Sequence, residues 1–369
     1  MTLRDRLLTL SDTSAPAMTT HHAERPAPPG KGMVRAAPLG PIPELLREFG
    51  RDPGPLLRQC GLPDEAILRN PDENVLFSAA GKLFLSAARV TGCPHFGLLV
   101  GQRGNVSMLG APGFLLRNAP DVRTALNELV SNLDLHDRGA TPFLEVIEDT
   151  CVVGYEIYQP GIEGTVQICD CSMAMGWNIL RTLCGPEWQP LEIRFRHDRP
   201  ADVEPYRRLF HAPLRFNARH TGLVFSARWL DAPVQHADPL LRQHFVDEIR
   251  ILRRHSNLGF RDQAYKLLVM LIGSQRCSLE QVAEHFSMHP RTLNRRLSDA
   301  GTSFRELYNE ARHEMARQLL RETGSSISAI ATLLGYSDAT AFNRAFSQWE
   351  GVSPARWRKR KNGVEADPA

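Results

Sequence analysis

A chain of 369 residues is long enough to form two domains. Hydrophobic residues make up 42% and charged residues 23%, which is typical of a globular protein and excludes a disordered or fibrous chain. No apolar run approaches the ~20 residues that a membrane span needs, and the first residues lack the apolar core of a secretory signal. We therefore expect a cytoplasmic protein that does not bind a membrane.

The cysteines indicate reduced thiols. They are an odd number, seven, and most have apolar neighbours: Cys60, Cys93, Cys151, Cys169, Cys171, Cys184 and Cys277. Cys169 and Cys171 form a Cys-x-Cys pair, but no second pair and no clustered histidines accompany them in the sequence, as a zinc site would require. We expect buried structural thiols, with no metal and no cofactor.

The net charge of +3 is unevenly distributed. Residues 261–360 carry 15 Lys and Arg against 10 Asp and Glu, whereas residues 1–260 carry 28 against 29. Thirteen of the 15 basic residues are Arg, whose guanidinium suits bidentate contacts with phosphate and guanine. This imbalance predicts a polyanionic partner for the C-terminal third of the chain.

The chain begins with a segment that predicts a mobile tail. Residues 1–32 combine Ser-Asp-Thr-Ser, His-His and a Pro- and Gly-rich run, and show almost no periodic apolar pattern. Met18 and Met33 are alternatives to Met1 as the start of translation.

Residues 33–237 predict an α+β domain. Their apolar periodicity favours helices over residues 75–91, 122–133 and 166–183. The first of these helices has an apolar stripe: Leu76, Ala80, Leu83, Phe84 and Ala87. Alternating apolar residues predict a hairpin over residues 143–158 and short strands at 191–195, 214–216 and 223–225.

The remainder of the chain predicts helices alone. Residues 238–259 read as a charged amphipathic linker helix, and strand patterns are absent from the sequence after it. Residues 260–361 therefore predict an all-α domain, and residues 362–369 a short tail.

A short helix-break-helix pattern occurs first at residues 278–298. Ser278 can cap a helix, and Pro290 suits the first position of the next one. In that second helix only Leu293 and Leu297 point to the core. Three polar residues share the outward face at spacings of three and four: Arg291, Asn294 and Arg295.

The same pattern recurs at residues 326–348. Ser326 can cap the first helix, and Gly335 permits the sharp turn that follows. The second helix buries Phe342 and Phe346. Its outward residues are Ala339, Thr340, Asn343 and Arg344.

Two short helices joined by a tight turn, with Arg and Asn exposed on the second, indicate a helix-turn-helix that reads bases in the major groove. A helix over Phe304–Arg321, about 27 Å long, would join the two units and place their reading helices near successive major grooves. The alternative is a basic helical bundle whose hairpins serve packing alone. Duplication, turn chemistry and outward Arg and Asn together favour the DNA-binding interpretation. Four further residues are candidate phosphate contacts: Ser278, Ser326, Arg358 and Lys359.

These residues resemble a known family. The segments Pro290–Leu297 and Ile330–Phe346, followed by Gly351–Pro354 and Trp357, are similar to the DNA-binding domain of AraC/XylS-family transcriptional regulators. The resemblance implies that the outward residues of both units face DNA. Ser287 and His289 depart from the family pattern, which commonly has a turn glycine and a capping serine there.

The N-terminal domain has a looser resemblance, to the arabinose-binding-like domain of ornithine-utilisation-type regulators. The matching segments are Phe195–Pro200, Tyr206–Phe210, Pro213–Phe216, Leu223–Phe225 and Leu230–Pro233. His211 replaces a frequent glycine. The resemblance implies a domain that senses a small molecule and assists homodimer formation.

We therefore expect a bacterial regulator that binds double-stranded operator or promoter DNA, catalyses no reaction, and contacts RNA polymerase if it is an activator. An architectural DNA-binding protein is one alternative, but it would not need an effector domain. An enzyme domain tethered to DNA is another, but the sequence lacks catalytic motifs such as G-x-S-x-G and HExxH. A fused DNA-repair methyl acceptor would need four N-terminal zinc-spaced cysteines, which the sequence also lacks.

Overall fold

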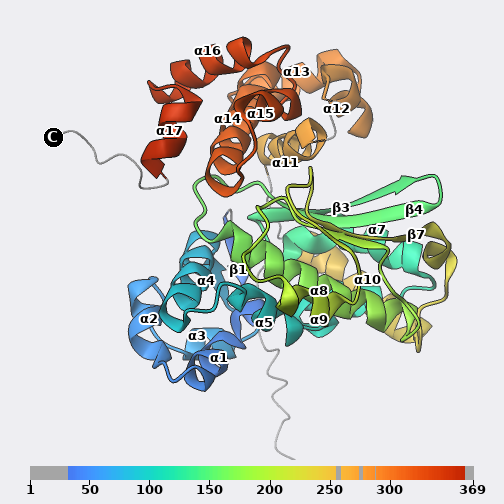
Figure 1. Ribbon diagram of the computed structural model, residues 1–369. Coiled ribbons are helices and arrows are strands. Elements are labelled where there is room, and N and C mark those ends of the chain that lie inside the picture. The colour runs from blue at the N-terminus through green and yellow to red at the C-terminus, as the bar shows by residue number, and fades with distance from the viewer. Residues whose placement is uncertain (1–31, 255–258, 274–276, 287, 362–369) are drawn as a thin grey trace, which may run out of the picture.

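The computed structural model describes residues 32–254, 259–273, 277–286 and 288–361. Residues 1–31 and 362–369 of the two predicted tails lie outside the described residues, as do Ser287 and most of the break between the linker helix and the all-α domain. Gly32, the last residue of the first tail, is described, and its amide donates to the Arg138 carbonyl at 3.3 Å. Figure 1 shows a mixed helix-and-sheet part below and a helical part above. The predicted fold class, α+β followed by all-α, is confirmed.

The N-terminal part begins with a small helical layer. Strands β1 (Met33–Arg35) and β2 (Asn74–Leu76) pair antiparallel. The helices of this layer are α1 (Ile42–Glu48), α2 (Pro53–Gln59), α3 (Ala66–Arg69), α4 (Phe77–Thr91), α5 (Phe96–Gln102), α6 (Ala111–Arg117) and α7 (Val122–Asn132).

The predicted helix at 75–91 begins later than its periodicity indicates. Val75 and Leu76 belong to β2, where Val75 pairs with Val34, and the helix starts at Phe77. Leu76 was expected in the buried stripe but is 56% exposed, whereas the other stripe residues are buried. Pairing with a strand that is distant in sequence thus overrides the local helical pattern.

A five-stranded sheet follows, and its strands are β3 (Ala140–Ile147), β4 (Thr150–Ile157), β5 (Glu192–Arg194), β6 (Leu214–Arg215) and β7 (Gly222–Ser226). Their spatial order is β3-β4-β7-β5-β6, and only β5 and β6 run parallel. The predicted hairpin is present as β3 and β4. Helix α9 (Glu204–Phe210) ends at His211, whose φ of +48° is left-handed and explains why glycine is frequent at this position in the resembling family.

Helix α8 (Thr165–Cys184) lies in the middle of the N-terminal part and contributes to both of its hydrophobic cores. It packs backbone against backbone on α5. A Cβ at Gly97 would lie 2.0 Å from the carbonyl oxygen of Gln167, and one at Gly101 would lie 2.3 Å from that of Cys171. Glycine is therefore required at both positions.

The predicted linker helix, α10 (Pro239–Arg254), packs on the N-terminal part. Phe245 stacks on Phe114 of α6 at a centroid distance of 5.0 Å, and Arg253 pairs with the buried Asp134 at 2.9 Å. The sequence showed its amphipathic pattern but not the surface that it covers.

The helical domain consists of α11 (Phe260–Gly273), α12 (Leu279–His285), α13 (Pro290–Asp299), α14 (Phe304–Glu322), α15 (Ile327–Leu333), α16 (Ala339–Glu350) and α17 (Pro354–Lys361). Its hydrophobic core is separate, and every fully packed member comes from residues 264–357. No single helix of the described segments is long and apolar enough to cross a membrane, and α4 and α5 meet that criterion only as a pair bent by 113°.

Candidate nucleic-acid interface and ligand cavity

The first helix-turn-helix is formed by α12 and α13. The Ser278 hydroxyl accepts a hydrogen bond from the Gln281 amide at 3.2 Å, so it caps α12 as predicted. Pro290 opens α13, and His289 caps it by accepting from the Arg291 amide through Nδ1 at 3.2 Å. A histidine thus provides the capping acceptor that the resembling family usually takes from serine.

The exposure of α13 follows the predicted pattern. Leu293 and Leu297 are fully buried, and Arg291, Asn294 and Arg295 are exposed. The helix therefore has one face in the core and one polar face available to a partner.

The second unit, α15 and α16, repeats this arrangement. Ser326 caps α15 by accepting from the Ala329 amide at 3.1 Å, and Gly335 has the left-handed φ of +74° that the turn requires. Asp338 caps α16 by accepting from the Ala341 amide at 2.7 Å, which lowers the pKa of its carboxyl group. In α16 Phe342 and Phe346 are buried, whereas Thr340 and Arg344 are exposed.

The other two predicted residues of α16, Ala339 and Asn343, are half-buried. They lie on the same helix as Thr340 and Arg344, beside the exposed face, so only part of each side chain is accessible.

Helix α14 joins the two units, and its 19 residues span about 28 Å. Figure 1 shows α13 and α16 at the end of the helical domain that points away from the sheet. The Arg312 guanidinium of α14 lies over the rings of Tyr308 and Tyr336, 4.4 Å and 4.1 Å from their centroids. This contact holds the turn of the second unit against α14, and sequence patterns did not indicate it.

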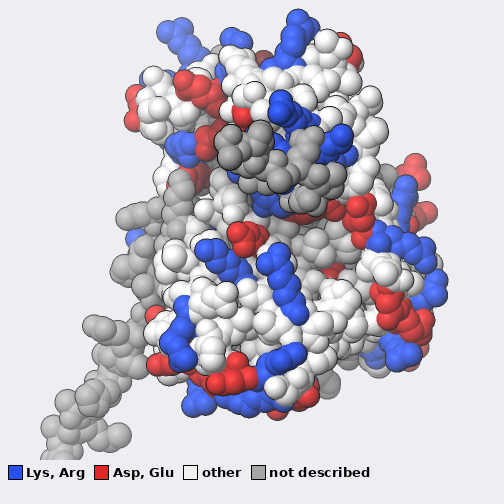
Figure 2. All heavy atoms as spheres, turned by 60° about the vertical axis from the view of Figure 1, so that its left-hand side comes forward, with Lys and Arg blue, Asp and Glu red and all other residues white. Residues whose placement is uncertain are grey.

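Basic side chains project from the outer edge of the helical domain, as Figure 2 shows. Among the predicted phosphate contacts, Ser326 and Lys359 are exposed and Ser278 is half-buried. Arg358 is half-buried and donates to the carbonyl oxygens of Leu320 and Ser325 at 3.2 Å and 2.7 Å. Its guanidinium therefore ties α17 to the end of α14, which leaves few of its donors for a phosphate.

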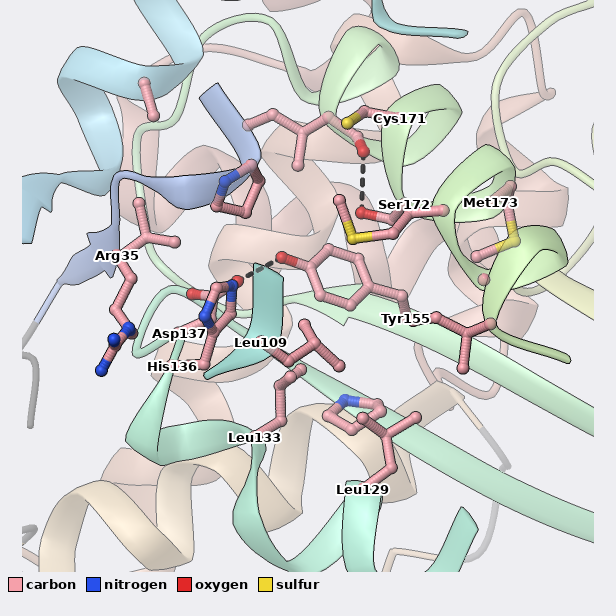
Figure 3. A pocket seen from close by; sticks show the side chains of 18 of the residues that line it. Arg35, Leu109, Leu129, Leu133, His136, Asp137, Tyr155, Cys171, Ser172 and Met173 are labelled. Atoms are coloured by element: carbon pink, nitrogen blue, oxygen red, sulfur yellow. Dashed lines mark hydrogen bonds between the residues drawn. The ribbon is translucent and has the colours of Figure 1, made fainter. Parts of the chain in front are cut away.

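A cavity of about 130 Å³ lies inside the N-terminal domain, between α4, α7, α8 and the sheet. Most of its wall is hydrocarbon, contributed by Leu39, Phe77, Phe84, Leu109, Leu129, Leu133, Val153, Ile168, Met173, Met175, Ile179 and Leu223. Figure 3 shows several of these side chains around the space. From the sequence we expected an effector in this domain, but we assigned none of these residues to a ligand site.

One end of the cavity is polar. Arg35 of β1, His136 and Asp137 before β3, and Tyr155 of β4 meet there (Figure 3). The Tyr155 hydroxyl donates to Asp137, which also accepts from the amides of Gly139 and Ala140 at 2.7 Å and 3.2 Å.

Burial shifts the pKa values of these groups. It raises the pKa of Asp137 to about 6, against the opposing effect of its hydrogen bonds. It lowers the pKa of His136 to about 3, assisted by the nearby positive charge of Arg35, so this imidazole is neutral at pH 7.

The cavity wall and the DNA-binding domain are linked through α8. Met173 of α8 lines the cavity, and Thr165 at its first turn donates to Glu322, near the end of α14. Next to this contact Asp198 accepts from the Gly324 amide at 2.9 Å. Partial burial raises the pKa of the Glu322 carboxyl group there.

A double helix-turn-helix joined to a domain with an internal cavity defines a DNA-binding regulator with a ligand-binding module. The family described as the arabinose-binding domain of AraC transcription regulator, N-terminal, matches residues 50–234, and a helix-turn-helix domain family matches residues 282–360. The chain belongs to the AraC family of transcriptional regulators.

Curated relatives agree with this membership over most of the chain. The HTH-type transcriptional regulator VirS of Mycobacterium tuberculosis is 30% identical over 88% of this chain and 96% of its own length. The ornithine utilization regulator of Pseudomonas aeruginosa is 26% identical over 86% and 93%. The crystal structure of the transcriptional regulator CdpR from Pseudomonas aeruginosa has a TM-score of 0.37 and 26% identity over 71% of this chain and 86% of that one.

Proposed function

We propose that α13 and α16 read base edges in two successive major grooves of an operator. The observation that supports this most strongly is the repeated geometry of the two units. Each reading helix is capped at its first turn, buries two apolar side chains and exposes at least one Arg. The proposed base-reading residues are those predicted: Arg291, Asn294 and Arg295 in α13, and Ala339, Thr340, Asn343 and Arg344 in α16.

Further residues are proposed to contact phosphates beside these base contacts. Ser278 and Ser326 lie at the N-termini of α12 and α15, where the helix dipole and free amides favour an anion. Lys359 is exposed on α17 and is the better candidate of the last helix, because Arg358 donates to backbone carbonyls. For Ser278, the hydroxyl is engaged as a cap through its oxygen and keeps its hydrogen to donate.

The cavity is the proposed effector site. It lies in the domain that matches the arabinose-binding family, and α8 connects its wall to α14. An effector that shifts α8 would alter a contact with the helix that spaces the two reading units. The protein is proposed to act as a homodimer in the bacterial cytoplasm, without catalysis, and to contact RNA polymerase if it activates transcription.

The experiment that tests the DNA assignment uses Arg295→Ala and Arg344→Ala in the full chain. Each change removes a guanidinium from one reading helix, and we expect each to weaken operator binding by about 1–3 kcal/mol. Base preference should relax in a different half-site for each variant. Systematic base substitution in the operator, with equilibrium binding measured for each duplex, provides the readout.

Arg208→Ala is the matched control. Arg208 is an exposed arginine of α9, outside the helical domain, so its loss removes the same charge from a surface that does not face the proposed operator. Its operator affinity should equal that of the unmodified chain. Equal losses on operator and random DNA for Arg295→Ala and Arg344→Ala would show that these residues do not read bases.

A further inference from the structure

The cavity of the N-terminal domain also restricts the chemistry of its ligand, and this step rests on the proposed effector role of that cavity. Its volume of about 130 Å³ is close to that of an apolar protein cavity of ~150 Å³ that holds benzene. The space therefore suits a compact molecule. Because most of the wall is hydrocarbon, most of the ligand must be hydrocarbon too.

The charged side chains at the polar end disfavour the binding of a cationic ligand and of an anionic ligand. Arg35 and Asp137 both line this end, and both are at most 5% exposed. A ligand cation would be placed close to Arg35, and a ligand anion close to Asp137. In a buried site such a contact between like charges costs free energy.

Arg35 and Asp137 already have partners within the protein. Arg35 already pairs with Asp72, and Asp137 already accepts hydrogen bonds from Tyr155 and two backbone amides. Arg35 therefore has a counter-ion already, and three neutral donors stabilise the carboxyl group of Asp137, so neither group depends on an ion from the ligand.

Hydrogen-bonding capacity nevertheless remains at this end. Among the described residues that line the cavity, two have a buried nitrogen without a hydrogen-bond partner: Arg35 through Nε and His136 through Nδ1. The remaining hydroxyl groups are engaged, because Tyr155 donates to Asp137 and Ser172 donates to the Ile168 carbonyl at 2.8 Å. Arg35 Nε–H is a donor, and Nδ1 of the neutral His136 is a donor or an acceptor according to its tautomer. Buried polar atoms of this kind normally have a hydrogen-bond partner.

We infer that the effector is a compact, uncharged, mainly hydrocarbon molecule with a single carbonyl or hydroxyl oxygen. The oxygen lies at the end of the cavity formed by Arg35, His136 and Asp137. The hydrocarbon part fills the space between α4, α7 and α8.

Four small probes of similar shape test this inference on the full chain. They are cyclohexanone, methylenecyclohexane, cyclohexylamine and cyclohexanecarboxylate, titrated at pH 7.5 and followed by ligand-observed NMR. Cyclohexanone should bind most tightly. Methylenecyclohexane has the same shape without the oxygen and should bind roughly 5- to 100-fold more weakly, because a buried donor stays unpaired. The ammonium and carboxylate probes should bind at least about 10-fold more weakly than cyclohexanone.

Variants locate the binding. Ala80→Leu places extra bulk in the cavity wall on α4 and should abolish cyclohexanone binding, whereas Ala88→Leu, on the same helix but outside the wall, should not. Arg35→Met should reduce the difference between cyclohexanone and methylenecyclohexane to less than about threefold. If Arg35→Met does not fold, His136→Phe tests the same polar end of the cavity and should reduce the same difference.

The outcomes separate the ligand class from the effector site itself. If a charged probe bound more tightly than cyclohexanone and Ala80→Leu blocked its binding, the ligand would not be uncharged. The cavity would still be a binding site. Equal binding of cyclohexanone and methylenecyclohexane would overturn the role of the oxygen. If none of the four probes binds, the cavity is a packing void, and both the effector site and its ligand class fail.

Discussion

The two domains place their polar groups in opposite ways. Among the described residues, all but one of the buried polar and charged side chains lie between Arg35 and Thr221, in the N-terminal domain. The exception is Thr323, at the end of α14. The helical domain instead has an apolar core, with Phe342 and Phe346 fully buried, and its arginines lie mostly at the surface.

This difference matches the role proposed for each domain. A DNA-binding surface needs charged side chains that are exposed to water before the nucleic acid binds. It also needs a rigid apolar core that keeps these side chains in fixed positions. A ligand-sensing interior needs polar groups near the ligand, and burying them is costly unless each is hydrogen-bonded. Both cases occur in one cavity. Asp137 is buried with three hydrogen-bond donors, whereas Arg35 Nε is buried without a partner.

The largest expected effect concerns salt and tests the outward charges of the helical domain. Operator affinity should fall linearly on a log–log salt plot with a slope of roughly −4 to −8, because phosphate contacts release counterions. Between about 50 and 200 mM salt this corresponds to a loss on the order of 10²- to 10⁵-fold. Fluorescence anisotropy with a labelled operator duplex measures it.

A fragment of residues 256–361 serves as the comparison in that experiment, because the helical domain has a core of its own. Its slope should approach that of the full chain, since the phosphate contacts belong to this domain. Its affinity should be lower if the N-terminal domain dimerises the protein. A slope near zero for the full chain would refute the proposed DNA interface.

An intermediate effect concerns acid and tests the buried groups of the N-terminal domain. Burial lowers the pKa of His136 from 6.5 to about 3, so the unfolded chain takes up a proton that the folded chain excludes. Stability is therefore lost as the pH falls from about 6.5 towards 3. Between pH 7 and pH 5 His136 should account for a loss of about 2 kcal/mol, which His136→Gln should remove.

Asp137 changes the stability with pH in the opposite direction to His136 and provides a matched control. Its pKa is raised from 3.8 to about 6, so the folded chain holds the proton more firmly and stability falls as the pH rises through that window. Asp137→Asn should therefore make the acid loss larger. Amide hydrogen exchange in β3 and β4, measured at pH 5 and pH 7, gives the free energy of opening of this domain. Equal acid losses in both variants and the unmodified chain would contradict these assignments.

The smallest expected effect concerns the thiols. Burial raises the pKa of Cys151, Cys171, Cys184 and Cys277 to about 12, so the reactive thiolate is scarce at pH 7. Operator affinity with and without a thiol reductant should agree within about twofold, and the oligomeric state should not change. Rapid reaction of Cys171 with a thiol reagent in the native protein would show that this interior is open to solvent.

Local patterns predicted the helical domain well. The caps at Ser278 and Ser326, the turn at Gly335 and the buried pairs on each reading helix depend on residues within about a dozen positions of one another. Hydrogen bonds and periodicity over such short distances are visible in a single sequence. The two units of this domain were therefore recognisable before their structure was described, although the base contacts themselves stay predictions.

The N-terminal domain was determined by contacts between distant parts of the chain. Val34 pairs with Val75 and converts a predicted helical turn into a strand, and α10 covers α6 through Phe245 and Phe114. Neither partner is indicated by a local pattern, because each contact joins residues that are far apart in sequence.

The sequence by itself determined the class of protein, the two helix-turn-helix units and the sign of the charge on the proposed DNA-binding face, since each of these depends on local spacing and composition. Only the tertiary structure brought Arg35, His136, Asp137 and Tyr155 together around one cavity. It also placed α8 between that cavity and α14. The physical reason is that burial and pairing depend on how distant segments pack, and the ligand chemistry follows from burial and pairing.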